Sequence, residues 1–195
     1  MKPNTRWAKS LVLFAVVLGV MLSTFTFAVL HHDDGDNRVA FTLVNHTGQR
    51  TGQDDLAGRH LLVFFGFTSC ANICPTQMSK LTSVMNALHE SGHGQRVTPV
   101  FVTVDPERDD PQQLAQYLAF FHDDFVGLTG SRSALKQAAG SFKTFLQAAP
   151  TDRVTGYQVT HSSIVYVVDP FSRIVDYIPL DVGHEALANK IREVL

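Results

Sequence analysis

The 195-residue chain is 45% hydrophobic and 17% charged, which excludes a disordered protein and suits one ordinary folded domain. Its two cysteines are too few for a disulfide scaffold. Residues 1–30 hold three basic residues and no acid, so the other 165 residues, with 13 basic and 18 acidic residues, carry a net charge of −5. That sign excludes the basic surface typical of nucleic-acid binding.

An uncharged apolar run, Leu11–Leu30, predicts a transmembrane helix near the start of the chain. Twenty helical residues span about 30 Å, the thickness of a bilayer's hydrocarbon core. Because the basic residues precede the run, we expect a single-pass anchor in the inner membrane, with residues 1–10 cytoplasmic and the body on the periplasmic side. The alternative is a signal peptide cleaved near Thr26–Ala28, a triplet with small residues at both ends. In both cases the rest of the chain is exported to an oxidising compartment.

Polar residues 31–38 are predicted to link this anchor to a domain at residues 39–195. In that domain, apolar runs of strand length alternate with segments whose apolar residues recur every three or four positions, as in amphipathic helices. The run Leu61–Phe67 is apolar throughout, which favours a strand covered on both faces. The predicted elements, in chain order, are strands Val39–Val44 and Leu61–Phe67, helix Pro75–Glu90, strand Val97–Val104, helix Pro111–His122, strand Phe125–Leu128, a helix from Ser131 to about Leu146, a hairpin of Ile164–Val168 and Ile174–Ile178, and helix Glu185–Val194.

This order of elements predicts an α/β fold with a central mixed sheet flanked by helices. Cys70 and Cys74 lie where a core strand ends and a helix begins, which is the layout of a thioredoxin-like fold. We expect the N–H groups of the helix N-terminus to favour the thiolate form, and the loop to keep both sulfurs near the surface. Thiolates at this place serve either as nucleophiles or as metal ligands.

The spacing of the cysteines leaves both uses open. Redox pairs in thioredoxin-like domains normally have two intervening residues, whereas three separate Cys70 from Cys74. The extra residue lets both sulfurs converge on one metal ion, although they can still close a disulfide. A purely structural role, as a static disulfide or as two inert buried thiols, is the disfavoured alternative, because so short a loop constrains little of the unfolded chain.

Among nine histidines, His161 is the strongest candidate for a third ligand. It directly precedes a late strand, at a chain position that faces the cysteine loop in thioredoxin-like folds and holds a proline in thioredoxins. Two thiolates and one imidazole favour copper, while zinc would accept the same set with a fourth ligand. His31 and His32, with Asp33 and Asp34, are a weaker alternative metal-binding group, because a linker at the membrane surface explains them more simply. The other histidines are expected in turns or at helix ends, where exposure or capping explains them; they are His46, His60, His89, His93, His122 and His184.

Three segments resemble the Sco/SenC family of membrane-anchored copper proteins: FFGFTSCANICP at 64–75, VFVTVDPERDDP at 100–111 and THSSIVYVVDP at 160–170. With the predicted anchor, the resemblance covers roughly residues 7–195. It implies a thioredoxin-like fold, binding of Cu(I) and Cu(II), and Cys70, Cys74 and His161 as the copper ligands. It also implies delivery of copper to the CuA-bearing subunit of cytochrome c oxidase, or reduction of that subunit's cysteines, and contact with other copper carriers or thiol reductants.

The chain departs from the family's pattern at three places. Ala71-Asn72 stand where Pro-Asp is common, Thr160 where an acid usually precedes the histidine, and Phe171-Ser172 where the hairpin usually has a glycine. The loss of two acids can alter the groups around the metal and its redox preference. Four acids after the 97–104 strand are interpreted as a turn and a helix cap, or alternatively as groups that dock a partner or tune the copper site; they are Asp105, Glu107, Asp109 and Asp110.

The leading hypothesis is therefore a membrane-tethered copper chaperone. A thiol–disulfide oxidoreductase that uses Cys70 and Cys74 without a metal is the alternative from a different class. A peroxiredoxin-like peroxidase is weaker, because Thr68 is close to the cysteines but no arginine is evident beside them. The pattern thus favours a chaperone over an enzyme.

Overall fold

The computed structural model describes residues 17–19, 21, 23, 37–71, 73–144, 147–148, 159–160 and 164–195. The chain divides into two compact units, Met1–Asp36 and Asn37–Leu195. Within the predicted span Leu11–Leu30, residues 17–19, 21 and 23 are helical, and the others lie outside the described residues. None of the helices in the described part of the chain is long and apolar enough to cross a bilayer.

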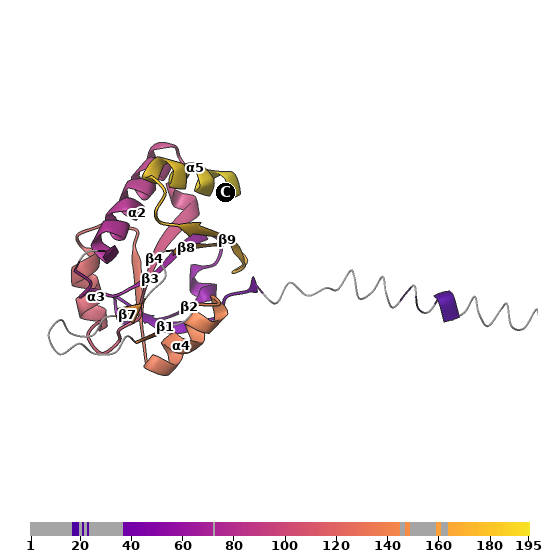
Figure 1. Cartoon of the computed structure of the whole chain (residues 1–195), viewed down its shortest axis with the longest axis horizontal. Coiled ribbons are helices and arrows are strands. Elements are labelled where there is room, and N and C mark those ends of the chain that lie inside the picture. The colour runs from indigo at the N-terminus through magenta and orange to yellow at the C-terminus, as the bar shows by residue number, and fades with distance from the viewer. Residues whose placement is uncertain are drawn as a thin grey trace, which may run out of the picture. The chain divides into compact units, whose positions relative to one another are not determined.

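A seven-stranded mixed sheet forms the centre of the larger unit (Figure 1). Its order is β2-β1-β5-β4-β3-β8-β9, in which β5, β4 and β3 are parallel and the strands on either side pair antiparallel. The strands are β1 Thr42–Asn45, β2 Arg50–Gly52, β3 His60–Gly66, β4 Val97–Thr103, β5 Val126–Thr129, β8 Ile164–Val168 and β9 Ile174–Pro179. The predicted α/β class with a central mixed sheet is confirmed.

Helices cover both faces of this sheet, which is why β3 and β4 are buried along their whole length. Alternate side chains of β3 point to opposite faces. Phe64 packs with Phe101, whose ring contacts Tyr117 of α3, whereas Phe65 packs against Phe142, directly after α4. Figure 1 shows α2 and α5 side by side. The helices are α2 Ile73–Glu90, α3 Pro111–Leu118, α4 Arg132–Ser141 and α5 His184–Val194, with short 3-10 turns η2 Gln53–Leu56 and η3 Gly94–Arg96.

With cysteines at the end of central strand β3 and at the start of α2, this is the thioredoxin-like fold that the sequence predicts. Side chains cap two of the helices, and Asp110 is the helix cap expected among the four acids after the 97–104 strand. The Asp110 carboxylate accepts a hydrogen bond from the Gln113 N–H at 2.7 Å, and the Ser131 hydroxyl accepts one from the Ala134 N–H at 3.2 Å. Such caps pair N–H groups that the first helical turn leaves unsatisfied.

Several predicted boundaries were wrong. The α2 helix begins two residues before Pro75, α3 ends at Leu118 instead of His122, and α4 ends at Ser141, followed by Lys143 at φ 52°. Strand β2 and the separate pair β6 Gln147–Ala148 with β7 Val159–Thr160 were not predicted, because two or three residues carry no periodic pattern. Arg38, the last residue of the predicted linker, forms an isolated antiparallel backbone bridge with Arg173 beside β9.

Candidate metal centre

The fold brings Cys70 and Cys74 together at one end of β3. Cys70 lies in the loop after Phe67, whose carbonyl accepts a hydrogen bond from the Cys70 N–H at 3.3 Å. Cys74 lies in the first turn of α2, and its N–H donates to the Cys70 sulfur at 3.4 Å. Both residues are thiols. The arrangement places two soft donors beside each other at the start of a helix, as the spacing predicts.

The two thiols differ in exposure. Cys74 is 0% exposed, whereas Cys70 is half-buried. Burial raises the pKa of the Cys74 thiol to about 12, the backbone of Phe67 opposes this rise, and the hydrogen bond and charge of Cys70 and the charge of Asp109 add to it. The expectations of a surface position and of a favoured thiolate were therefore wrong for Cys74, because desolvation outweighs the helix N-terminus.

A glycine lets Cys74 pack directly under the end of the sheet. A Cβ atom at Gly66 would lie 3.2 Å from the Cys74 sulfur and 2.8 Å from the ring of Phe101. The same Cβ would lie 3.1 Å from the ring of Phe64. These contacts join the cysteine turn to the aromatic core, so its position depends on the packing of β3 and β4.

A buried carboxylate holds the cysteine loop to the end of β4. Asp109 is 0% exposed and accepts hydrogen bonds from the Thr68 N–H at 3.0 Å and from the Thr68 hydroxyl at 2.6 Å. It also accepts one from the Thr103 hydroxyl at 2.6 Å. Because Thr68 is two residues before Cys70, these bonds position the loop that carries the outer sulfur.

The other acids of this segment bind groups outside the cysteine loop. Asp110 caps α3, which confirms the cap interpretation. Asp105 is buried and accepts a hydrogen bond from the Arg108 guanidinium, which lies 5.9 Å above the Phe67 ring centre. Glu107 is paired with Arg132 at 2.6 Å on the surface. Asp109 is thus the acid that touches the cysteine loop directly.

Sequence reasoning missed the hydroxyl of Tyr117, which the periodicity places only on the apolar side of α3. This hydroxyl is buried, and no hydrogen-bond partner for it exists among the residues that the structure describes. Burial raises the pKa of Tyr117, and the charges of Cys74, Cys70 and Asp109 raise it further. Thr68 and Thr103 were also missed as supports, because hydrogen bonding between distant segments leaves no local signal.

His161 lies outside the described residues, so its predicted place beside the sulfurs remains a prediction. In the hairpin that follows, Ser172 adopts φ 66° at the position where the family usually has a glycine, and Asp169 accepts hydrogen bonds from the backbone of Phe171 and Arg173. His60 was expected to be exposed, but it is buried on β3, and burial, then the charge of Arg96, lowers its pKa.

The comparisons with known proteins agree on one family. A family model described as SCO1/SenC matches residues 31–195. The mitochondrial SCO2 homolog of Danio rerio is 41% identical over 78% of this chain and 54% of its own length. An SCO2-like protein of Rickettsia prowazekii is 37% identical over 73% of this chain and 69% of its own. The chain spans about half the length of the vertebrate SCO2 homologs it matches.

The solved structures extend this agreement to three dimensions. Copper-bound ScoI of Arabidopsis thaliana superimposes with a TM-score of 0.75 at 31% identity, over 80% of this chain and 96% of that one. Yeast Sco1 superimposes with a TM-score of 0.74, also at 31% identity, over 81% of this chain and 96% of that one. The thioredoxin-like fold is therefore shared with these proteins.

Proposed function

The chain belongs to the SCO1/SenC family, and we propose that it is a copper chaperone that carries the ion on Cys70, Cys74 and His161 and serves cytochrome c oxidase assembly. Copper is the cargo of this reaction, and the CuA-bearing subunit of the oxidase is its recipient. The single observation that carries the proposal is the contact between the two cysteines, with the Cys74 N–H 3.4 Å from the Cys70 sulfur. The copper-bound relative in Arabidopsis thaliana supports the choice of metal.

The donor set fits copper in both oxidation states. Thiolates are soft ligands that select Cu(I), and an imidazole also suits Cu(II). The start of β8 at Ile164 lies beside the end of β3 that leads into the cysteine loop, because the two strands pair antiparallel. This supports the choice of His161, three residues earlier in the sequence, as the third ligand. A carrier has to release its ion as well as bind it, and a three-ligand site leaves a coordination position at which a recipient's ligand can attack.

The buried thiol defines a proton step that accompanies copper loading. With its pKa raised to about 12 by burial, the Cys74 thiol is protonated at neutral pH. Metal ligation requires the thiolate, so binding releases that proton to solvent. Cys70, being half-buried, is the sulfur that an incoming copper carrier meets first.

The test is a copper titration of the reduced full chain in mild detergent. Cu(II) is added to one equivalent, and the thiolate-to-copper charge-transfer absorption is recorded. We expect Cys70→Ser and Cys74→Ser to abolish this absorption, and His161→Ala to shift the band and weaken binding at least about tenfold, as loss of a ligand does. His46→Ala is the matched control, because His46 lies in the turn before β2, where its Nδ1 accepts a hydrogen bond from the Gly127 N–H at 3.1 Å.

Two outcomes would contradict the proposal. Charge-transfer absorption that survives Cys70→Ser would remove the cysteine pair from the copper site. Copper affinity that is equal in His161→Ala and in His46→Ala would remove the histidine. Far-UV circular dichroism of each variant verifies that it is folded.

The difference in exposure between the thiols favours a second candidate function, reduction of a partner's disulfide. In this reaction the Cys70 thiolate attacks the partner's disulfide, and Cys74 then displaces the partner, so that two electrons and two protons pass to the partner as the pair forms its own disulfide. Reduction needs no imidazole. Disulfide reduction that persists in His161→Ala, together with loss of copper binding, would separate the two functions.

A membrane tether at Leu11–Leu30, with the folded domain on the periplasmic side of the inner membrane, is part of the proposal. The uncharged run and the basic residues before it support this orientation. Retention of the chain in the membrane after alkaline carbonate extraction, with the domain digested by protease added to spheroplasts, is the expected result. A processed, carbonate-soluble domain would support the cleaved signal peptide instead.

A further inference from the structure

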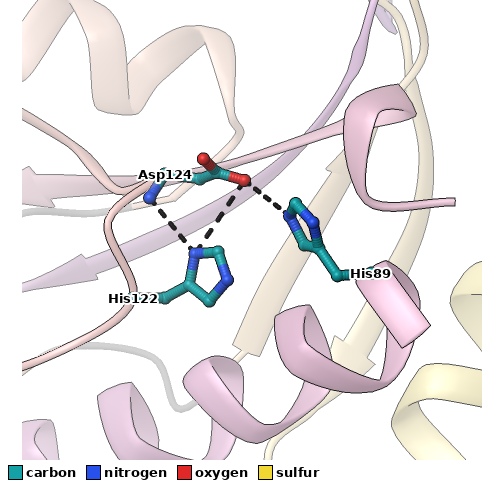
Figure 2. A group of neighbouring side chains, drawn as sticks. All are labelled: His89, His122 and Asp124. Atoms are coloured by element: carbon teal, nitrogen blue, oxygen red, sulfur yellow. Dashed lines mark hydrogen bonds and ion pairs between the residues drawn. The ribbon is translucent and has the colours of Figure 1, made fainter. Parts of the chain in front are cut away.

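A second group of metal-binding side chains lies at the opposite end of α2 from the cysteines. His89 is in the last turn of that helix, and His122 and Asp124 are in the loop between α3 and β5. One ligand atom from each residue lies within 4.8 Å of the others, and the residues described here contain no other such group of three. Figure 2 shows both imidazole rings facing the same oxygen of the Asp124 carboxylate.

The distances are close to those of a coordinated ion. The Asp124 Oδ2 atom is 2.8 Å from Nε2 of His89 and 3.9 Å from Nδ1 of His122. Ligands about 2.0–2.1 Å from a tetrahedral metal lie about 3.3 Å from one another. One separation is thus slightly short and the other slightly long, and side-chain movements of about 1 Å bring both to the required value.

The backbone and neighbouring elements hold these rings in place. A Cβ atom at Gly94 would lie 2.3 Å from the His89 ring, so the ring lies directly against the 3-10 turn η3. The His122 N–H donates to the Thr82 hydroxyl of α2 at 3.3 Å, which ties the loop to the helix that carries His89. The two rings are 5.0 Å apart between centres, at 34° to each other. This fixed spacing reduces the ordering that an ion would have to impose.

The hydrogen bonds define the protonation of the two rings. His89 Nε2 donates to the Asp124 carboxylate at 2.8 Å, so it has to lose this proton, or carry it on Nδ1 instead, to bind an ion. The Asp124 N–H donates to Nδ1 of His122 at 3.1 Å, so this nitrogen carries no proton and its lone pair accepts that bond. An ion at the centre exchanges that weak hydrogen bond for a coordination bond. The side chains are 34%, 15% and 35% exposed for His89, His122 and Asp124, so an ion and its water ligand can enter from solvent.

From this geometry we infer that His89, His122 and Asp124 form a second metal site, specific for a divalent transition-metal ion such as Zn²⁺ or Cu²⁺. Two imidazoles and a carboxylate are nitrogen and oxygen donors, which suit these ions and leave a position for water. The site has no sulfur and therefore does not select Cu(I). At 1.5 Å per helical residue, it lies about 22 Å along α2 from Cys74, so the two sites load independently.

The proposed site is tested with Zn²⁺ as the only metal, in a chain that lacks the other candidate metal ligands. The full chain is prepared in mild detergent with Cys70→Ser, Cys74→Ser, His31→Ala and His32→Ala, so that neither the cysteine pair nor the histidines of the linker can bind. Competition with a chromophoric chelator then gives the zinc affinity. We expect one equivalent of Zn²⁺ to bind, with coordination shifts at the ring nitrogens of His89 and His122 in ¹⁵N NMR spectra.

Single variants of this parent test the ligands. His89→Ala and Asp124→Asn should each weaken zinc binding at least about tenfold, and Asp124→Asn keeps the shape of the side chain. His93→Ala is the matched control, since His93 lies four residues after His89 and its Nδ1 contacts the Ser91 hydroxyl at 3.2 Å instead. Absence of zinc binding in the parent, or equal affinities in His89→Ala and His93→Ala, would overturn the inference and leave the three residues as an ion pair.

Discussion

Replacing Asp109 with Asn tests whether the buried carboxylate organises the cysteine loop. The carboxylate accepts three hydrogen bonds from Thr68 and Thr103, of 2.6–3.0 Å. Asn keeps one acceptor oxygen but has an NH2 group in place of the other. The threonine hydroxyl that faces this NH2 group would have to rotate and accept a hydrogen bond where it now donates one. A hydrogen bond to a charged group contributes about 1.5–3 kcal/mol, and its neutral counterpart about 1 kcal/mol. The change should lower the free energy of unfolding by about 2–4 kcal/mol.

The same variant should change the chemistry of the inner thiol. Burial, the main reason for the raised pKa of Cys74, is unaffected, but the charge of Asp109 also raises it, so its removal should lower this pKa while leaving it above the ordinary cysteine value. The ¹³Cβ shift of labelled Cys74, followed against pH, measures the change at this site alone. Urea unfolding followed by far-UV circular dichroism measures stability, because the single tryptophan, Trp7, belongs to the other unit, Met1–Asp36, and does not report on Asn37–Leu195.

Asp110→Asn is the matched control, since it removes the same charge one residue away and keeps a side chain that caps a helix well. Its free energy of unfolding should stay within about 0.5 kcal/mol of the unmodified chain. Equal stabilities for the two variants, or a Cys74 pKa that does not fall in Asp109→Asn, would refute the assigned role of Asp109.

Three further predictions use the same unfolding measurement. Gly66→Ala should lower the free energy of unfolding by about 1–3 kcal/mol, because the new Cβ would lie 2.8 Å from the ring of Phe101. Gly140→Ala in α4 is its control; the new Cβ meets nothing within 4 Å, so the free energy of unfolding should rise by about 0.5–1 kcal/mol. Equal effects of the two changes would contradict the close packing at Gly66. Because the pKa of His60 is lowered by folding, His60 takes up its proton at a higher pH in the unfolded chain than in the folded one. The contribution of His60 to stability should therefore be largest above pH 6.5 and decrease as the pH falls below it. His60→Gln should flatten this decrease, and an unchanged slope would exclude His60 as its source. Tyr117→Phe should leave stability unchanged or raise it by up to about 1 kcal/mol, because it removes a buried hydroxyl that lacks a partner among the described residues; a loss above about 1 kcal/mol would mean that the hydroxyl is bonded.

Periodicity predicts the parts of the fold that long segments dominate. The unbroken run at 61–67 indicated a strand covered on both faces, and β3 is buried along its whole length. The apolar spacing at 75–90 indicated α2, whose true start two residues earlier carries no distinguishing pattern. Strand β2 has three residues, too few for a period, and forms because it pairs with β1. Local pattern therefore predicts the centre of the sheet, and tertiary pairing decides its edges.

The candidate site, like the fold, could be predicted only in part from the sequence. The positions of Cys70 and Cys74 follow from the boundary between a strand and a helix, which the sequence displays. Their difference in exposure does not, because it depends on Gly66 and on the packing of β3 against β4. Asp109 is 41 residues from Thr68, and only folding brings the two together. The cluster of His89, His122 and Asp124 was missed for the same reason.

X-ray absorption spectroscopy of the full chain loaded with one equivalent of Cu(I) tests the central claim most directly, because it counts the atoms bound to the ion. The account predicts two sulfurs and one nitrogen, with the nitrogen lost in His161→Ala and both sulfurs retained. A shell of nitrogen and oxygen without sulfur, or a nitrogen that persists in His161→Ala, would contradict it.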